Sequence, residues 1–339
     1  MTEAPGIAIL GQGFMGRAHA EALRALRSPR LVALAGRDAG RLEEMRERYG
    51  FARVTTDWRE LLADDVDVVL NLGPNALHAE PTIAAAEAGK HVLCEKPLAR
   101  SADEARSMLA AVGDVVAMCG FNYRFVPAVQ RAKRLVEAGE IGDVLHFRGT
   151  YRQSWGSSTE DVWRFDAAQA GGGALGDLAS HVVDLARYLV GDLDSIAAQA
   201  ATFVPGREVD DAVAAAVRFA GGAIGTIEAT RFATGEANRF TWEINGTRGS
   251  LAFDVERPGE LIHDGRRVFC DDRWPPGHVL GWGDSFFFEL RHFLAAVAGR
   301  GTVGPHGATF ADGVAAAEAC DAILRSAETG QRITLKGTP

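Results

Sequence analysis

The sequence predicts two domains: an α/β domain with a doubly wound parallel sheet at residues 1–121, and an α+β domain with a large, mostly antiparallel open sheet at residues 122–339. The length of 339 residues suits two domains better than one. Residues 1–120 alternate short apolar runs with helical patterns, which is typical of a parallel sheet. Beyond residue 144 strand patterns follow one another without crossover helices, which favours antiparallel pairing.

In the first domain, a helix is predicted after each of the first two strands. Apolar residues recur every four positions in the first helix, at Phe14, Ala18, Ala22 and Leu26. The second helix repeats this pattern with Leu42, Met45 and Tyr49, and Asp38 is placed to cap its start. The strands are expected at residues 6–10, 31–35, 66–72, 91–95 and 115–119.

The second domain is predicted to begin with a helix near residues 127–138 and an alternating strand at 144–152. Apolar alternation on both sides of Gly221-Gly222 predicts a hairpin with a glycine turn. Asn245-Gly246 and Asp264-Gly265 mark two further turns of the sheet. Helices near 284–298 and 309–328 close the chain, and we expect the C-terminal helix to pack back on the first domain.

The composition excludes several classes of protein. Hydrophobic residues make up 47% and charged residues 24%, as in soluble globular proteins, and the net charge of −9 disfavours a nucleic-acid partner. No apolar run reaches the roughly 20 residues of a membrane helix. The N-terminus leads into a strand without a signal segment, so we expect a cytoplasmic protein with no membrane partner. The cysteines are scattered, which favours free thiols and no metal site; they are Cys94, Cys119, Cys270 and Cys320.

A glycine turn, Gly11-Gln12-Gly13-Phe14-Met15-Gly16, lies between the first strand and the first helix. In this position Gly11 permits a tight turn, Gly13 lets the backbone approach a pyrophosphate, and Gly16 allows the helix to pack closely on the strand. The start of the helix offers amide donors to the phosphates. The turn therefore predicts a Rossmann domain that binds a nicotinamide dinucleotide; the alternative is a structural turn without a ligand.

The second strand leaves the choice of dinucleotide open. NAD-binding versions usually carry an acid at its end, which bonds the ribose 2′-hydroxyl, whereas this chain has Gly36-Arg37. Gly36 leaves room where the carboxylate would lie, and Arg37 could pair with a 2′-phosphate. Asp38 could still reach the ribose, although helix capping alone explains it. The cofactor is expected to be NAD or NADP, with NADP favoured and dual use open.

Two further segments leave the sheet at the edge where doubly wound folds bind ligands. They are Gly73-Pro74-Asn75 and Glu95-Lys96-Pro97. The second directs two charged side chains toward the expected nicotinamide end of the cofactor. The alternative is a solvated strand end with a turn proline.

A second glycine-rich loop, residues 171–176, leads into a helix that carries Asp177 and His181. These residues lie one helical turn apart, so both can face one substrate. They share a polar stripe with Asp184 and Tyr188, about 100° from the apolar stripe of the helix. For His181 alone, a structural histidine would be the better interpretation; the nearby acid and the glycine loop favour a catalytic one.

These motifs together resemble the Gfo/Idh/MocA oxidoreductases. The resemblance rests on the glycine turn, Gly73-Pro74-Asn75 with His78, Glu95-Lys96-Pro97, Asn122-Tyr123-Arg124, and the glycine loop leading to Asp177 and His181. It covers essentially the whole chain. It implies that Lys96, Asp177 and His181 are catalytic, that Glu95 contacts the cofactor, that the Lys96-Pro97 bond is often cis in such proteins, and that the open sheet builds homodimers or homotetramers.

Within the family, residues 163–177 look most like those of sugar dehydrogenases of the levoglucosan and inositol type. Trp155, Trp163 and Trp274 could supply platforms for sugar C–H faces, with core or interface packing as the alternative. The residues expected to contact substrate are Lys96, Tyr123, Arg152, Trp155, Trp163, Asp177 and His181. Those expected to contact cofactor are Gly11, Gln12, Gly13, Phe14, Met15, Gly36, Arg37, Gly73, Pro74, Asn75, His78, Glu95, Lys96, Asn122 and, by resemblance only, Arg164. The missing acid at Gly36 departs from NAD-dependent inositol dehydrogenases.

The predicted reaction is the oxidation of a ring secondary alcohol of a sugar or polyol, or the reverse ketone reduction. His181 is the expected general base, since an imidazole has an unperturbed pKa of about 6.5. Asp177 would bond a neighbouring hydroxyl, and Lys96 would donate to the reacting oxygen. Two alternatives remain: a glycosidase with tightly bound NAD, and a non-catalytic dinucleotide-sensing regulator.

Overall fold

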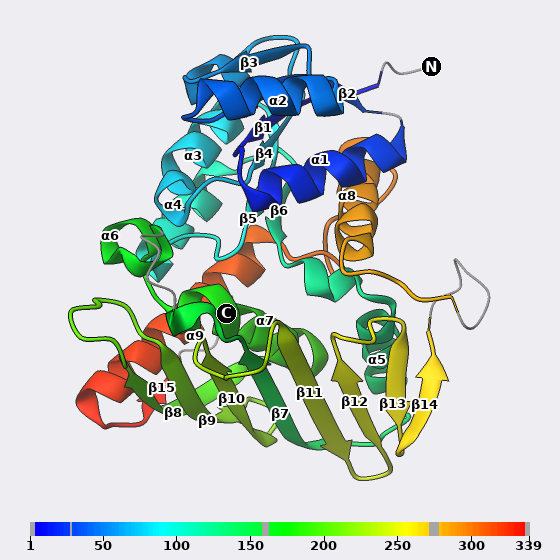
Figure 1. Ribbon diagram of the computed structural model, residues 1–339. Coiled ribbons are helices and arrows are strands. Elements are labelled where there is room, and N and C mark those ends of the chain that lie inside the picture. The colour runs from blue at the N-terminus through cyan, green and yellow to red at the C-terminus, as the bar shows by residue number, and fades with distance from the viewer. Residues whose placement is uncertain (1–3, 28, 158–162, 271–277, 336–339) are drawn as a thin grey trace. The chain divides into compact units, whose positions relative to one another are not determined.

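The computed structural model describes residues 4–27, 29–157, 163–270 and 278–335. Its contacts group the chain into two compact units, each described here by itself (Figure 1). One comprises residues 1–122 and 283–314, the other residues 123–282 and 315–339. Two expectations stay predictions. One is that the chain divides at residue 121 into a dinucleotide-binding and a substrate-binding domain; the other is that the last helix packs on the first domain.

The first unit is built on a six-stranded parallel sheet in the order β3-β2-β1-β4-β5-β6. This is the doubly wound order, whose direction reverses between β1 and β4. The α/β prediction is thereby confirmed. The strands are β1 (Gly6–Leu10), β2 (Arg30–Ala35), β3 (Arg53–Thr55), β4 (Val68–Asn71), β5 (His91–Glu95) and β6 (Ala117–Gly120).

Helices connect strands of this unit: α1 (Phe14–Leu26), α2 (Ala39–Tyr49), α3 (Ala79–Glu87) and α4 (Ala102–Ala111) (Figure 1). A further helix, α8 (Asp284–Val297), joins the unit from the later part of the chain. α1 packs against α2 and α8, and α3 packs against α4. The Asp38 carboxylate caps α2 by accepting from the Arg41 amide, and Leu42, Met45 and Tyr49 are buried, as predicted.

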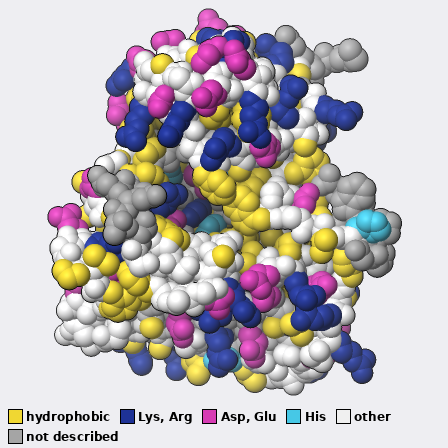
Figure 2. All heavy atoms as spheres, viewed as in Figure 1, with side chains coloured by type: hydrophobic (Ala, Val, Ile, Leu, Met, Phe, Trp, Pro, Cys, Tyr) yellow, Lys and Arg dark blue, Asp and Glu magenta, His cyan; other side chains and the backbone are white. Residues whose placement is uncertain are grey.

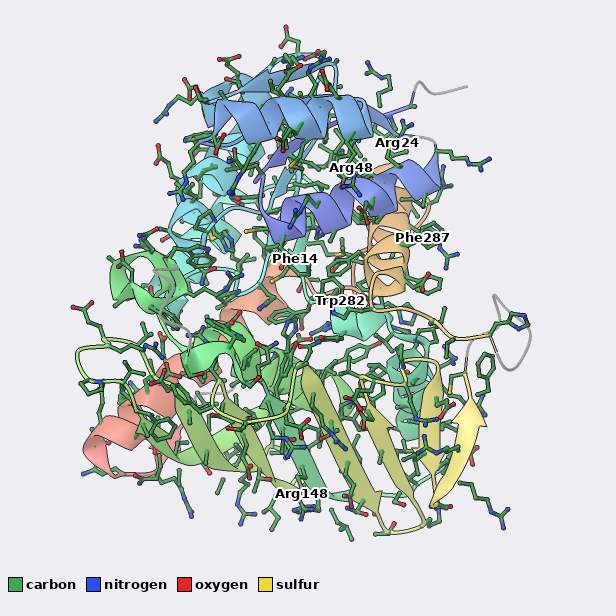
Figure 3. All side chains as sticks on the ribbon, viewed as in Figure 1. Phe14, Arg24, Arg48, Arg148, Trp282 and Phe287 are labelled. Carbon is green, nitrogen blue, oxygen red and sulfur yellow. The ribbon has the colours of Figure 1, made fainter. Side chains whose placement is uncertain are left out.

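The buried face of α1 differs from the predicted stripe. Phe14, at the start of α1 in Figure 3, is 59% exposed, and Ala18 and Leu26 are only half-buried. The helix instead buries a face that includes Gly16, His19, Ala20, Ala22 and Leu23. The reason is the close approach of the first turn to the sheet, since a Cβ on Gly16 would lie 1.9 Å from the carbonyl oxygen of Gly11. A four-residue period could not identify that face.

The second unit is built on a nine-stranded sheet in the order β14-β13-β12-β11-β7-β10-β9-β8-β15. Among the described strands of this sheet, only β7 and β10 pair in parallel, so the mostly antiparallel sheet is confirmed. The strands are β7 (Val144–Arg152), β8 (Leu193–Ala201), β9 (Ala212–Phe219), β10 (Ile224–Thr230), β11 (Arg239–Gly246), β12 (Ser250–Asp254), β13 (Glu260–His263), β14 (Arg266–Phe269) and β15 (Ile333–Thr334).

One face of this sheet is covered by α5 (Pro127–Glu137) and α7 (Ser180–Leu189). Gly149 of β7 makes this packing possible, because a Cβ there would lie 2.4 Å from the Val182 side chain of α7. The other face carries mostly small and polar residues together with Ile224, and Arg148 of β7 projects outward at the lower edge of Figure 3. The unit also contains the short helix α6 (Ala167–Ala170), and α9 (Phe310–Thr329) runs from the first unit into the second.

Two of the three predicted turns lie where expected. Gly222 joins β9 to β10 at a φ of +94°, and Asp264-Gly265 joins β13 to β14 with φ values of +49° and +75°. Asn245-Gly246 instead ends β11, and the turn follows at residues 247–249. Glycine is required at 246 by packing, since a Cβ there would lie 2.2 Å from the Ile141 carbonyl oxygen.

Acidic and basic side chains alternate over the surface of the first unit, shown at the top of Figure 2, with no continuous basic field on that face. No helix in the described part of the chain is long and apolar enough to cross a membrane.

Candidate active site

The glycine turn between β1 and α1 has the shape of a phosphate cradle. Gly11 has a φ of +133°, and a Cβ on it would lie 2.6 Å from the Leu72 carbonyl oxygen. Around Gly13, by contrast, no described atom lies within 4 Å of an added Cβ. No side chain of the described residues caps α1 at Gly13, and its first turn carries no acid. An uncapped helix start beside open space fits a pyrophosphate group.

The end of β2 is filled by the glycine turn itself. A Cβ on Gly36 would lie 2.2 Å from the Gln12 side-chain oxygen, which accepts a hydrogen bond from the Asp38 amide at 3.0 Å. The room beside Gly36 is therefore taken by Gln12. Arg37 is exposed. If the ribose lies at the end of β2, as the sequence predicts, its polar neighbours include the Gln12 amide as well as Arg37 and Asp38.

His78 joins the two other segments at the carboxyl edge of the sheet. Its Nδ1 lies 2.8 Å from the Pro97 carbonyl oxygen and its Nε2 lies 3.1 Å from that of Gly73. Burial lowers the pKa of His78, whereas its bonds to these carbonyl oxygens raise it. The side chain therefore braces the Gly73-Pro74-Asn75 turn against Glu95-Lys96-Pro97, which makes its support of a cofactor indirect. The Lys96-Pro97 bond is cis.

Behind Lys96 lies a buried cluster of three titratable side chains, His19 of α1, Glu95 of β5 and Glu289 of α8. The His19 Nε2 lies 3.8 Å from a Glu95 oxygen and 3.6 Å from a Glu289 oxygen. Burial raises the pKa of Glu95 to about 7 and that of Glu289 well above its usual range. The other Glu95 oxygen accepts from the Lys96 amide at 3.0 Å. Glu95 thus fixes the backbone that carries Lys96.

Two predicted cofactor residues of this unit, Asn75 and Asn122, are nearly fully buried. The Asn122 amide donates to the Ser285 hydroxyl at 2.8 Å. That bond ties the end of the parallel sheet to α8. The first unit therefore gathers the glycine turn, Gly36-Arg37, Gly73-Pro74-Asn75, Glu95 and Lys96 around one edge of its sheet.

In the second unit, a buried acid holds the glycine-rich loop. The Asp210 carboxylate accepts from the amides of Gly173 and Leu175, each at 2.7 Å. Glycine is required at 173, because a Cβ there would lie 1.7 Å from the Asp210 carbonyl oxygen. The loop continues into a π-helical turn, Leu175–Ala179, and then into α7. Such turns occur frequently at functional sites, and this one carries Asp177.

Asp177 lies between two guanidinium groups. Its Oδ2 accepts from the Arg231 Nη2 at 3.2 Å, and its Oδ1 lies 3.7 Å from the Arg164 Nε. The Asp177 side chain is 18% exposed, whereas that of Arg231 is 0% exposed. The sequence prediction missed Arg231 and Asp210, because each acts on a residue more than 30 positions away and neither belongs to a recognisable motif.

His181 follows on α7 and packs against an aromatic cluster. Its ring centroid lies 4.7 Å from that of Tyr123 and 5.9 Å from that of Tyr151. The hydroxyls of Tyr123 and Tyr151 are 3.0 Å apart, and Tyr151 donates to Asn238 at 2.8 Å. Tyr123 is 2% exposed, so its part in the site is chiefly to hold His181 in place.

The polar stripe of the helix divides into two parts. Asp177 and His181 face the loop and the aromatic cluster, whereas Asp184 pairs with Arg124 through both carboxylate oxygens at 2.7–3.1 Å. The Arg124 guanidinium also lies 4.7 Å from the Tyr188 ring centre. Both charged groups are almost fully buried, so this half of the stripe anchors α7 to the Asn122-Tyr123-Arg124 segment.

The predicted sugar platforms have different surroundings. The Arg231 guanidinium lies 4.5 Å from the Trp155 ring centre, and that of Arg164 lies 4.5 Å from Trp163. Arg152 follows Tyr151 on β7 and therefore points to the opposite face of the sheet, where its guanidinium is 3.6 Å from Glu236. The structure does not bring Arg152 toward His181. Trp274 lies outside the described residues.

No group of three or more His, Cys, Asp or Glu side chains within the described ranges could hold a metal ion. What this arrangement offers is a dinucleotide cradle with a lysine in one unit, and a fixed acid–histidine pair in the other.

Comparison with known proteins gives both units relatives. Residues 6–123 match the model of an oxidoreductase family with an NAD-binding Rossmann fold, and residues 129–252 match that of the GFO/IDH/MocA C-terminal domain. Levoglucosan dehydrogenase of Pseudarthrobacter phenanthrenivorans is 40% identical, over 95% of both chains. Inositol 2-dehydrogenase of Rhizobium meliloti is 30% identical, over 96% of this chain and 98% of that one. A solved structure of levoglucosan dehydrogenase with NADH and levoglucosan matches with a TM-score of 0.93 and 40% identity, over 97% and 99% of the two chains.

Proposed function

The chain belongs to the Gfo/Idh/MocA family of NAD-binding oxidoreductases, and on that premise we propose that it is a dehydrogenase for a ring secondary alcohol of an anhydrosugar or an inositol. The observation that carries the proposal is the Asp177–His181 pair, held by Asp210 and Arg231, in a chain whose other unit presents Lys96 beside a dinucleotide cradle. The 40% identity to levoglucosan dehydrogenase supports an anhydrosugar as the substrate.

When bound, the nicotinamide supplies the acceptor for the hydride that leaves the alcohol carbon. His181 takes the proton of the reacting hydroxyl as general base. Asp177 accepts a hydrogen bond from a neighbouring hydroxyl and so orients the ring. Lys96 donates to the reacting oxygen and stabilises its developing negative charge. The tight packing of His181 against Tyr123 and Tyr151 limits the base to a narrow range of orientations.

We propose NAD rather than NADP as the preferred cofactor. Gln12 occupies the room beside Gly36, and its amide is a neutral partner suited to a ribose hydroxyl. The solved relative with NADH supports the same choice. We also propose that the protein acts in the cytoplasm, a reducing compartment that suits the free cysteines of the described residues.

A substrate panel tests this proposal. Levoglucosan, myo-inositol, scyllo-inositol and methyl glucosides are each incubated with NAD and, separately, with NADP, and reduced nicotinamide is followed by absorbance. We expect turnover of at least one anhydrosugar or inositol, with kcat/KM at least about tenfold higher for NAD. Absence of turnover with every polyol and both cofactors would contradict it. Release of a free sugar without net NADH formation would identify the glycosidase alternative instead.

We further propose that the open face of the second sheet joins copies of the chain into a homodimer or homotetramer. Ala214 and Ala216 of β9 are exposed there, beside Ala197 of β8 and Thr226 of β10, and these residues line a hollow of about 370 Å³. Small side chains on a broad sheet allow a second sheet to approach closely.

Ala216→Arg tests the oligomer. We expect light scattering coupled to gel filtration to give a dimer or tetramer for the native chain and a monomer for the variant, because a buried unpaired guanidinium is costly. Ala110→Arg, on an exposed position of α4, serves as the matched control and should keep the native mass. A monomeric native chain would contradict the proposal.

A further inference from the structure

Arg231 is a buried arginine that contacts Asp177 but takes no part in the proton or hydride transfer proposed above. It follows β10 directly, and its side chain is 0% exposed. Its Nη2 donates to Asp177 at 3.2 Å, its Nη1 donates to the Arg164 carbonyl oxygen at 3.4 Å, and its guanidinium lies 4.5 Å from the Trp155 ring centre. These contacts involve both terminal nitrogens and one face of the guanidinium group.

Such a position is costly for a positive charge. Burial lowers the pKa of Arg231, while Asp177 and Asp210 act in the opposite direction. The Asp210 carboxylate oxygens accept hydrogen bonds from the amides of Gly173 and Leu175. The carboxylate that is hydrogen-bonded to Arg231 is that of Asp177. A buried guanidinium bonded to one partly exposed carboxylate fixes that carboxylate more firmly than a surface pair would.

We propose that Arg231 is the positioning residue that holds the Asp177 carboxylate as a charged hydrogen-bond acceptor, so that Asp177 orients the substrate and His181 alone acts as base. This inference rests on the proposed function. Without Arg231, the carboxylate could rotate about χ1 and χ2, and a neighbouring hydroxyl of the substrate would lose its partner. The Trp155 ring, stacked on the same guanidinium, would lose its support as well.

The effect of Arg231 on Asp177 has two parts, the position of the carboxylate and the charge beside it, and two variants can separate them. Arg231 faces it from the segment after β10 and Arg164 from the segment before α6. His181 lies one turn further along the same helix. Burial is the main cause of the raised pKa values of the Tyr123 and Tyr151 hydroxyls, and the negative charge of Asp177 also contributes to them. Arg231→Lys keeps the positive charge but removes the planar pair of donors, whereas Arg231→Gln removes the charge.

The test compares both variants with the native enzyme on whichever sugar the native chain oxidises. We expect each to lower kcat/KM by about 100-fold, the size of effect that a 1 Å misplacement can produce, with an unchanged Kd for NAD. In Arg231→Gln alone, the acid limb of the pH profile of kcat/KM should move up by about one pH unit, because the charge that favours deprotonated groups nearby is gone.

Arg207→Gln is the matched control. Arg207 is also a buried arginine of this unit, paired with Asp211 at 2.5 Å and lying 3.7 Å from the Phe165 ring centre, but no described contact joins it to Asp177. We expect it to lower thermal stability while leaving the pH profile unchanged. Equal pH shifts in Arg231→Gln and Arg207→Gln, or native kcat/KM in both Arg231 variants, would overturn the inference.

Crystal structures of the native chain and the two Arg231 variants complete the test and need no turnover. We expect Asp177 to adopt a new rotamer in Arg231→Gln; an Asp177 side chain that stays in place in both variants would overturn the proposal. Should the native chain oxidise no polyol, the proposed function would fail, and the rotamer of Asp177 would still decide on Arg231.

Discussion

Replacing His181 with alanine is expected to lower kcat by about two to four orders of magnitude, the usual contribution of general base catalysis. His181 is 5% exposed and packs against both Tyr123 and Tyr151, so no solvent-exposed group can easily take its place. The Kd for NAD should stay unchanged, because His181 belongs to the unit that lacks the glycine turn. Steady-state kinetics and calorimetric titration with NAD measure the two quantities.

Two checks keep this result interpretable. His181→Asn retains a polar group of similar breadth at the aromatic cluster, and it should lose as much activity as the alanine variant while unfolding at a temperature closer to that of the native protein. His263→Ala, at the end of β13, removes a partly exposed histidine and should behave like the native enzyme. Equal losses of turnover and of NAD affinity in His181→Ala would argue against His181 as the base.

The fold could be predicted where one physical pattern dominates. Strands β1, β4 and β5 are buried along almost their whole length, so they appear in the sequence as continuous apolar runs. β3 spans only Arg53–Thr55, and all of its residues are half-buried, so it leaves no such run. The buried face of α1 was mispredicted because Gly16 and His19 are not read as core residues, although close packing and burial place them there.

The site could be predicted only where its partners are near in sequence. Asp177 and His181 lie four positions apart behind a glycine loop, and this local pattern is visible. Arg231 acts on Asp177 from 54 positions away, and Asp210 holds the loop from 37 and 35 positions away. Nothing distinguishes these two residues in the sequence from surface charges at strand ends. Their positions follow from the sheet register, which pairs the start of β9 with the end of β10. Asp210 just before β9 and Arg231 directly after β10 therefore lie close together, beside the glycine loop.

Replacing Gly13 with alanine is expected to weaken NAD binding by roughly ten- to a hundredfold, which corresponds to the usual 1–3 kcal/mol penalty of an overpacked contact. Gly13 has φ −85° and ψ −158°, an extended conformation that alanine adopts without strain. No described atom lies within 4 Å of the added Cβ, so the free protein has room for it. Only a pyrophosphate lying against the backbone would meet the new methyl group.

Gly16→Ala provides the contrast that separates a ligand cradle from a structural turn. Its Cβ would lie 1.9 Å from the Gly11 carbonyl oxygen, so the backbone must move even without a ligand. The clash outweighs the helix preference of alanine, which is about 1 kcal/mol. We therefore expect thermal unfolding to show a lower Tm for Gly16→Ala and an unchanged or slightly higher Tm for Gly13→Ala. No described atom of the protein would meet a Cβ at position 13, so only a bound ligand could require glycine there. Native NAD affinity in Gly13→Ala would therefore mean that the turn does not hold the cofactor.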